Sequence, residues 1–481
     1  MGSKLNSSAL VGLGVVAGVA ISMQFSAIAQ KPIEAGMPLE ELRQLADVYG
    51  LIKSDYVEAV DDKKLLTEAI SGMVASLDPH SAYLDQKAFR ELRESTQGKF
   101  VGLGIEIAQG EDGNVRIVAP IEDSPAYRAG IKAGDLITRI DNSSLQGLGL
   151  DEAIKKMRGE PRTRVTLTVL RKDEPAPLAF TIQREEIRQK SVKGKIVEPG
   201  YAWLRIAQFQ EPTVDDLAAR IAVLYKQEPN LKGLVLDLRN DPGGVLQGAI
   251  GVSAAFLPKD AAIVSTNGQL ADSRQTFYGR PEYYALRNDS DALAHLPAGL
   301  KNVPMVVLVN TGSASASEIV AGALQDHKRA AILGSQTFGK GSVQTIRPMV
   351  GDTAVKLTTA RYYTPNGRSI QAKGIVPDYM VDEYADGDGI NALRPRESDL
   401  DKHLANDRDQ ELAKQDQGDG AALRRLVAQE RKRKPLEYGG ADDFQLAQAL
   451  NHLKGLPMQL SKREPRTTLA HEDKLAPAAG K

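Results

Sequence analysis

The chain has 481 residues, a length that suggests two to four domains. Its 61 lysines and arginines almost balance its 62 aspartates and glutamates, so the formal net charge of −1 does not favour binding to nucleic acid or to an acidic membrane surface. The absence of cysteine excludes a thiol nucleophile, a disulfide and a thiolate metal site. The six histidines form no H-E-x-x-H pair, so we expect no metal and no cofactor.

The first 29 residues have the pattern of an export signal. Lys4 precedes an apolar stretch, Ala9–Met23, that is short for a membrane span, and Ala27-Ile28-Ala29 has the small-x-small form of a cleavage site. We therefore predict a signal peptide over residues 1–29 and a mature chain beginning at Gln30, with an uncleaved anchor as the alternative. Either way the bulk of the chain is expected to be exported, to a bacterial periplasm or cell envelope.

Residues 30–98 are predicted to form an N-terminal helical region. Apolar residues recur at helical spacing in two stripes, one from Leu42 to Tyr56 and one from Leu65 to Val74, and the segment Leu77–Ser81 interrupts the pattern.

Residues 99–185 carry an ordered series of short motifs. A strand is expected at Phe100–Ile107, and an S-P-A run at Ser124–Ala126 is followed by A-G and G-D pairs that end at Asp135. The strands Leu136–Ile140 and Val165–Leu170 and the helix Leu150–Met157 complete the series, which resembles a PDZ domain.

This resemblance implies a peptide-binding site. PDZ domains bind a peptide's terminal carboxylate with the loop that here matches Val101-Gly102-Leu103-Gly104. They recognise the peptide by strand addition together with a side-chain pocket. The candidates for that pocket are Leu103, Ile105, Ile154 and Met157.

Residues 186–385 alternate strands with helices, which predicts an α/β core with much parallel pairing. The stretch Thr266–Leu300 breaks the alternation and carries four aromatic residues, so it is either a substrate-facing insertion or a packed loop. The expected fold class is α/β multidomain, with the PDZ domain inserted between the N-terminal helical region and this core. The alternating elements are Ala202–Ile206, Val214–Lys226, Gly233–Leu238, Gly248–Phe256 and Val303–Val309.

A serine-rich turn follows the last of these strands. Ser315 is the first residue of the predicted helix Ser315–Gln325, at the turn that follows the strand. At the start of a helix the backbone N–H groups lack intrahelical partners and can bind an anion. A serine there can be a nucleophile. The same residue forms a capping box with Glu318, and Ser313 and Ser317 are rival candidates.

A second motif contains a lysine. The run from Gly334 to Lys340 matches a phosphate-binding loop up to the lysine, but Gly341 replaces the Ser or Thr that holds magnesium. No helix pattern follows, because the next segment is short and contains Pro348. A nucleotide site is therefore disfavoured, and Lys340 is free to act as the base for a serine.

Three motifs together decide between these interpretations. The runs GSASASE (Gly312–Glu318), FGKGSVQ (Phe338–Gln344) and LVLDLRNDPGG (Leu234–Gly244) resemble those of the carboxy-terminal processing peptidases, or tail-specific proteases. The resemblance extends from about Leu39 to Asp382. It implies that Ser315 is the nucleophile, that Lys340 is its base, and that Gln344 belongs to the same catalytic set.

The chemistry of this set is consistent. A lysine can take the serine proton only when it is neutral, and burial lowers its pKa towards working pH. Residues four apart on a strand share a face, so Gln344 is expected to orient Lys340 without holding it charged. His327 is the histidine nearest to Ser315 in sequence, but it lies at a helix C-terminus, where histidine usually caps carbonyls.

The oxyanion of an acyl-transfer reaction needs two N–H donors. Ala316, next to the nucleophile, is one candidate. The resemblance implies that the glycine turn after the strand Gly233–Leu238 faces the serine, so Gly243 or Gly244 is expected to supply the other donor.

Residues 386–481 form a charged, glutamine-rich extension that the resemblance does not reach. Two amphipathic helices are predicted, at Leu423–Arg433 and Phe444–Lys454, and Pro457–Lys481 is predicted to be disordered.

These observations predict an exported serine endopeptidase that acts on proteins with accessible C-termini through an acyl-enzyme. The family resemblance implies a homo-oligomer assembled through the N-terminal helices, although those helices can equally pack on the core. An adaptor protein is a further partner to consider. The PDZ domain either gates the site or only tethers substrate. The alternative function is an inactive PDZ scaffold, which should have lost the serine or the lysine.

Overall fold

The computed structural model describes residues 38–109, 114–145, 149–172, 174–285, 290–408 and 436–462. The chain divides into two compact units, residues 1–70 and residues 71–481. The predicted signal peptide, the predicted helix Leu423–Arg433 and most of the predicted disordered end lie outside the described residues. Within them, no helix is both long and apolar enough to cross a membrane.

The first unit contains helix α2 (Leu39–Asp55) and the beginning of α3 (Asp62–Ala75), as the apolar stripes predict. Glu40 and Glu41 lie in the first turn of α2 and Lys53 in its last, where their charges complement the helix dipole. None of the side chains of α2 is buried, so its apolar stripe is exposed.

The second unit begins with the end of α3. β1 (Ala82–Leu84) and α4 (Gln86–Gln97) follow, and α4 ends at Gly98 in the left-handed conformation. The predicted strand Phe100–Ile107 is wrong, because the chain forms two strands there, β2 (Lys99–Gly102) and β3 (Ile105–Gln109). The break lies at Gly104, where φ is +75° and a Cβ would meet the Ser124 Cβ at 2.2 Å. β2 pairs antiparallel with β9 (Glu185–Arg188) instead of joining the next sheet.

A small sheet follows, in the order β3-β4-β5-β7-β8, with β6 beside β5. The predicted strand Leu136–Ile140 and helix Leu150–Met157 have the predicted bounds, and one hydrophobic cluster fills this domain. The bounds are β4 (Val115–Pro120), α5 (Pro125–Arg128), β5 (Leu136–Ile140), β6 (Ser143–Ser144), α6 (Leu150–Met157), β7 (Arg164–Leu170) and β8 (Leu178–Gln183).

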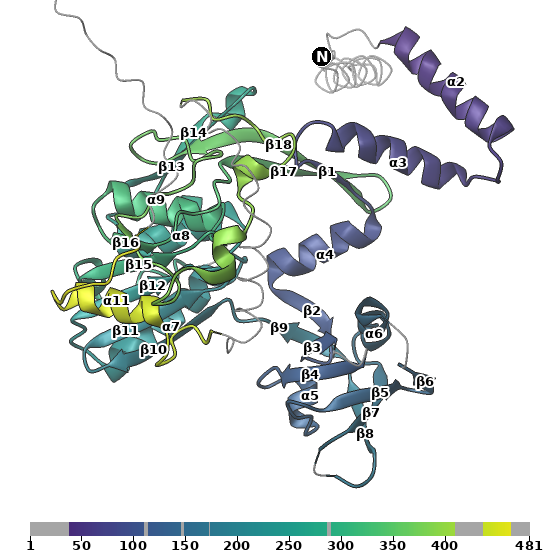
Figure 1. Cartoon of the computed structure of the whole chain (residues 1–481). Helices are drawn as coiled ribbons and strands as arrows, with labels where there is room; N and C mark the ends of the chain where they lie inside the picture. Colours follow the sequence, from purple (N-terminus) through teal and green to yellow (C-terminus); the bar gives the residue numbers. More distant parts are fainter. Residues whose placement is uncertain are drawn as a thin grey trace, which may run out of the picture. The chain divides into compact units, whose positions relative to one another are not determined.

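The predicted α/β core is built on a six-stranded sheet of order β10-β11-β12-β15-β16-β19 (Figure 1). β10 is antiparallel to β11, and every other neighbouring pair is parallel. The bounds are β10 (Val192–Glu198), β11 (Tyr201–Ile206), β12 (Gly233–Asp237), β15 (Met305–Val309), β16 (Ala331–Gly334) and β19 (Tyr379–Met380).

Helices cover both faces of this sheet. Helices α7 (Thr213–Gln227), α8 (Leu246–Phe256) and α9 (Ala316–Asp326) share one hydrophobic cluster with Val307 and Val309 of β15. Val306 and Leu308 point to the other face and pack in a second cluster with α11 (Phe444–Leu453). Strands buried on both faces have continuous apolar sequences, as β15 does.

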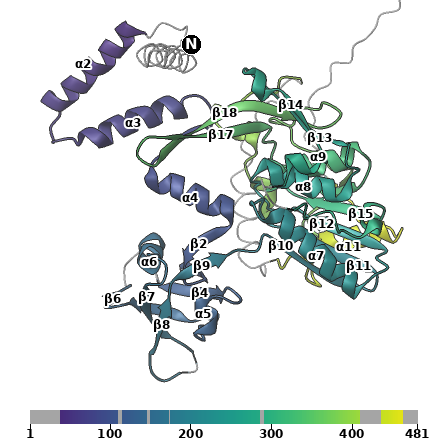
Figure 2. The same cartoon turned by 180° about the vertical axis from the view of Figure 1, so that it is seen from behind.

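The position of α11 corrects the expectation of a separate C-terminal extension. The helix exists nearly as predicted, but it belongs to the core of the peptidase domain. α11 lies in front of β12 and β15 in Figure 1 and behind them in Figure 2. Its buried residues Leu446, Ala449 and Leu450 cover the face of the sheet that α7, α8 and α9 leave open.

A second sheet has the order β1-β18-β13-β14, with β17 paired to β18. It contains β13 (Ala262–Gly268), β14 (Gln275–Tyr278), β17 (Ser342–Met349) and β18 (Thr353–Tyr363). The stretch Thr266–Leu300 contributes β14, and its Tyr284 is buried against the core, which favours the packed-loop interpretation. The short 3-10 helices are η1 (Ala271–Ser273), η2 (Pro281–Tyr283), η3 (Ala298–Lys301), η4 (Gly389–Leu393) and η5 (Glu397–Asp399).

Candidate active site

Three loops meet at one edge of the six-stranded sheet. β12, β15 and β16 are parallel neighbours, with Asp237 opposite Leu308 and Val309 opposite Gly334. The segments that leave their carboxyl ends therefore lie together, in the position where open α/β sheets bind ligands. These segments carry the glycine turn, the serine-rich turn and Lys340.

Among the described residues, Ser315 is the serine of its turn whose hydroxyl donates no hydrogen bond to a backbone carbonyl. The Ser313 hydroxyl donates to the Leu238 carbonyl at 2.8 Å, and the Ser317 hydroxyl donates to the Asp241 carbonyl at 2.8 Å. Both rivals are fully buried, whereas Ser315 is half-buried. The predicted capping-box arrangement of Ser315 and Glu318 is present, but the Ser315 hydroxyl makes no cap hydrogen bond, and the N–H of Glu318 donates to the Ser315 carbonyl at 2.9 Å. The cap therefore leaves the nucleophile candidate available.

The backbone of Ser315 is strained. Its φ of 55° and ψ of −111° lie in a region of backbone conformation that residues other than glycine rarely adopt. Such a conformation costs on the order of 1–3 kcal/mol. Such strain is characteristic of functional turns.

The buried carboxylate of Glu318 joins the serine turn to the lysine loop. One oxygen accepts from the N–H groups of Ser315 at 2.8 Å and Lys340 at 2.9 Å. The other accepts from the N–H of Gly339 at 2.7 Å and from the hydroxyl of Thr337 at 2.5 Å. Burial raises the pKa of Glu318 to about 7, although these four hydrogen bonds favour its charged form. The sequence indicated only the cap, and the two loops could be joined only by the fold.

Lys340 lies in surroundings that lower its pKa. Burial is the largest cause, and the like charge of Lys356 acts in the same direction, against the carboxylates of Glu397, Glu318 and Asp78. The backbone of other segments approaches the glycines on both sides of Lys340. A Cβ at Gly339 would lie 3.1 Å from the Ala372 carbonyl carbon, and a Cβ at Gly341 would lie 2.4 Å from the Gln371 N. These glycines therefore permit the tight packing that the sequence predicts around the lysine.

Gln344 does not reach Lys340 by the predicted route. Lys340 precedes β17, which begins at Ser342, so the strand alternation expected to place Gln344 on the same face does not extend to Lys340. The Gln344 amide donates to the Ser342 hydroxyl at 3.0 Å and to the Thr358 hydroxyl at 3.2 Å. Among the described residues no hydrogen bond joins it to Lys340.

The glycine turn packs directly against the serine. A Cβ at Gly243 would lie 2.9 Å from the Ser315 Cβ and 2.8 Å from the Ala316 N, so glycine is required for this approach. The N–H of Gly243 donates to the Asp241 carboxyl at 2.9 Å. In the described part of the chain, the N–H groups of Gly244 and Ala316 have no hydrogen-bond partner. Gly244 is therefore the better candidate of the two glycines for an oxyanion donor.

Tyr362 is a site residue that the sequence did not indicate. It lies on β18, where the pairing of Ser342 with Arg361 brings it beside the lysine loop. Its hydroxyl donates to the Lys340 carbonyl and interacts with the Ser315 side chain. Burial and the nearby Glu318 carboxylate raise its pKa well above the ordinary value, so it stays protonated. Nothing local in the sequence distinguishes it from a core tyrosine.

His327 has a structural role. It caps the C-terminal end of α9, the opposite end from Ser315, and its Nε2 is 2.7 Å from the Ala262 carbonyl oxygen.

The predicted peptide-binding residues fall into three environments. Val101 pairs with Glu186 in the β2–β9 ribbon, Leu103 and Met157 belong to the hydrophobic core, and Ile105 and Ile154 are half-buried. The carbonyls of Leu103 and Gly104 accept from Ala126 and Ile121. Their N–H groups have no hydrogen bond within the described residues, which suits a loop that binds a carboxylate.

Comparison with curated proteins decides the family. The chain is 46% identical over 373 residues to a carboxy-terminal-processing protease of Bartonella bacilliformis, covering 76% of this chain and 82% of that protein. The chain belongs to the carboxy-terminal-processing protease family. The model of peptidase family S41 matches residues 200–381, and that of a PDZ domain matches residues 116–171. The protein is therefore a serine-type peptidase, with a PDZ domain between an N-terminal region and the peptidase domain.

Other family models, curated proteins and solved structures are also similar to this chain. The model of the activating protease CtpB N-terminal domain matches residues 15–88. A probable CtpA-like serine protease of Staphylococcus aureus is 39% identical over 346 residues, 71% of this chain and 65% of that protein. Among solved structures, a photosystem II D1 C-terminal processing protease is 29% identical, with 71% of this chain and 86% of that chain covered and a TM-score of 0.40.

Proposed function

We propose that this family member is an exported endopeptidase with a Ser315–Lys340 dyad, and that it cleaves proteins through an acyl-enzyme. The observation that carries this proposal is the shared hydrogen bonding of Glu318. This one buried carboxylate fixes the backbone of the serine and of the lysine, while the serine hydroxyl stays available.

In the proposed mechanism Lys340 is neutral before substrate binds. It takes the Ser315 proton as the serine oxygen attacks the scissile carbonyl, and the N–H groups of Ala316 and Gly244 stabilise the oxyanion. The lysine then passes the proton to the departing amine, which leaves the acyl group on the serine. Water, activated by the same lysine, hydrolyses this ester and restores the serine.

The remaining residues hold this geometry. Tyr362 fixes the Lys340 carbonyl, and Glu318 fixes the N–H groups of both reacting residues. Gln344 transfers no proton, because its neutral amide does not titrate near working pH, and the amide donates to Ser342 and Thr358. Its proposed role is to hold β17 in place behind the lysine.

Substrates are proposed to bind by an exposed C-terminus at the PDZ loop Val101–Gly104. The free N–H groups of Leu103 and Gly104 support a carboxylate there. The exposed apolar stripe of α2 supports assembly into a homo-oligomer through the N-terminal helices. Export by the first 29 residues and help from an adaptor protein complete the proposal, and N-terminal sequencing of the mature protein is expected to begin at Gln30.

The decisive experiment compares the purified protein with a Ser315→Ala variant on an unfolded protein substrate. Cleavage and labelling by a fluorophosphonate should both disappear in the variant. Lys340→Ala should lose nearly all turnover, and Lys340→Arg should be no better, because arginine does not deprotonate in proteins. An active Lys340→Arg variant would refute the dyad. Activity should persist in a chelator.

A further inference from the structure

Asn240 links the glycine turn to the serine-rich turn. It lies between β12 and the glycine turn, with φ of 53°. Its N–H donates to the Asn310 side chain at 2.9 Å, and the Asn310 amide donates back to the Asn240 oxygen at 3.0 Å. A Cβ at Gly312 would lie 2.5 Å from that same oxygen. A shift of Asn240 must therefore move one turn against the other.

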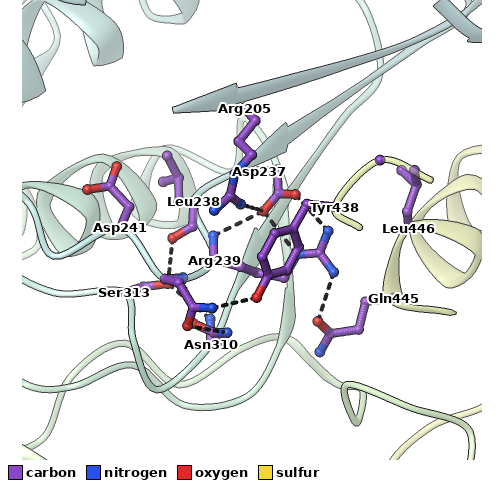
Figure 3. Close-up of polar contacts among 12 residues, drawn as sticks. Arg205, Asp237, Leu238, Arg239, Asp241, Asn310, Ser313, Tyr438, Gln445 and Leu446 are labelled. Atoms are coloured by element: carbon purple, nitrogen blue, oxygen red, sulfur yellow. Dashed lines mark hydrogen bonds and ion pairs between the residues drawn. The ribbon is translucent and has the colours of Figure 1, made fainter. Parts of the chain in front are cut away.

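The amide of Asn240 is itself held from the C-terminal part of the chain. Its nitrogen donates to the Tyr438 hydroxyl at 2.5 Å, and its oxygen accepts from Arg394 at 2.6 Å. Tyr438 belongs to the described segment 436–462, which lies beyond the match to the peptidase family. Figure 3 shows Tyr438 beside Arg205 and Arg239, with Asn310 and Ser313 on the side of the serine-rich turn.

A buried charge cluster fixes Tyr438. Its ring lies against the guanidinium groups of Arg205 at 4.1 Å and Arg239 at 4.6 Å. Arg239 is fully buried between the carboxylates of Asp237 at 2.6 Å and Asp443 at 2.7 Å. Asp443 is also the N-cap of α11. Removing one partner of a buried ion pair is strongly destabilising, so this segment is firmly docked.

We propose that the segment 436–462 contributes to catalysis through Tyr438. Tyr438 is a positioning residue: it fixes Asn240 and, through Asn240, the glycine turn beside Ser315. The inference rests on the proposed function, because it assigns the glycine turn a role in catalysis. The segment 436–462 would then have a catalytic role in addition to covering one face of the six-stranded sheet.

The test removes one hydroxyl. Tyr438→Phe keeps the ring over both arginines and deletes the acceptor of the Asn240 amide, together with a 3.5 Å hydrogen bond to the Glu383 carboxylate. The kcat per active site should decrease about tenfold, the equivalent of about 1.4 kcal/mol. KM should not change. Tyr379→Phe is the matched control. Tyr379 is half-buried, its ring contacts the ring of His452 of α11 in a tilted arrangement, and its hydroxyl has no hydrogen bond among the described residues.

The rate is expressed per active site, by titration with a fluorophosphonate. A merely structural role would lower the titrated fraction and leave the rate per site unchanged, and that result overturns the proposal. In an Asn240→Ala background, Tyr438→Phe should have no further effect, because Tyr438 acts through Asn240. An equal loss in both backgrounds also overturns it.

The labelling rate of Ser315 separates the two proposals. It depends on the serine and the glycine turn but not on a protein substrate. If no protein is cleaved but Tyr438→Phe slows labelling about tenfold, the proposed function fails and the positioning role stands. If the parent cleaves protein, and Tyr438→Phe and Asn240→Ala both match the rate of the parent within about twofold, the positioning role fails and the proposed function stands.

Discussion

Replacing Glu318 by glutamine tests whether one buried carboxylate holds the nucleophile and the base in register. One oxygen accepts from the N–H groups of Ser315 and Lys340, and the other accepts from the Gly339 N–H and the Thr337 hydroxyl. Glutamine keeps the size but has one acceptor oxygen and one donor NH₂. In either orientation, the NH₂ group faces at least one backbone N–H group.

The cost follows from this mismatch. The better orientation directs the amide oxygen at Ser315 and Lys340, because the Thr337 hydroxyl can rotate to accept and the Gly339 N–H cannot. One buried donor then stays unsatisfied, at about 1–3 kcal/mol, and the remaining bonds lose their charge assistance. If this cost displaces Ser315 and Lys340 from their reactive arrangement, it raises the activation barrier, and kcat decreases by roughly 10- to 100-fold with KM unchanged.

The pH dependence of unfolding gives a second readout. The pKa of Glu318 is raised from 4.5 to about 7, so between these values the folded protein keeps a proton that the unfolded chain has released. The associated stability is complete below the unfolded value and is lost as pH rises through the folded one, by about 3 kcal/mol. Glutamine does not titrate, so the stability of the parent relative to the variant should decrease by that amount over this range.

Urea unfolding at about pH 5 and about pH 8 measures this difference, and kcat is taken per titrated active site. Glu211→Gln, at an exposed glutamate, should match the parent in both measurements. The reasoning is refuted if the Glu318→Gln variant keeps a kcat within about twofold of the parent, or if its stability deficit is equal at both pH values.

Three further predictions concern other groups. Burial raises the pKa of Asp241 to about 8, and its Oδ2 has no hydrogen-bond partner among the described residues. Asp241→Asn should therefore stay active near neutral pH and remove a loss of stability between about pH 4 and pH 8; an unchanged unfolding profile contradicts this. Lys356→Met removes a like charge that lowers the pKa of Lys340, so the acidic limb of kcat/KM should move to higher pH, and a shift to lower pH excludes this role. A short C-terminal peptide added in trans should stimulate cleavage of an unrelated reporter if the PDZ domain gates the site, whereas simple competition would leave only tethering.

The parts of the fold that local pattern determines could be predicted. β15 is buried on both faces, so its apolar run identified it, and α6 was bounded by its own amphipathic spacing. The predicted strand Phe100–Ile107 failed because Gly104 takes a left-handed turn against Ser124, a contact between segments that no strand propensity reports. The glycine itself was visible in the sequence, but its φ was not.

Sequence identified the candidate site residues that stand within a recognisable local motif, but not how these residues come together. Ser315 and Lys340 come from separate motifs, and parallel pairing of β12, β15 and β16 brings their loops together. The strand argument for Gln344 failed because β17 begins only at Ser342, after Lys340, and nothing in the run FGKGSVQ marks where the strand begins. Tyr362 and Tyr438 reach the site by pairing and packing between segments far apart in the chain.

The strain at Ser315 explains why such distant groups are needed. In isolation, the sequence S-A-S-E favours an ordinary helix cap, in which the serine hydroxyl accepts a backbone N–H. Holding the serine at φ 55° instead must be offset elsewhere, and the compensating contacts come from other loops. Glu318 accepts the Ser315 N–H while it is itself fixed by the lysine loop, and Gly243 allows the glycine turn to pack against the serine Cβ. The reactive conformation of Ser315 is therefore a property of the assembled edge of the sheet, and any substitution that loosens a neighbouring loop should return the hydroxyl towards the cap.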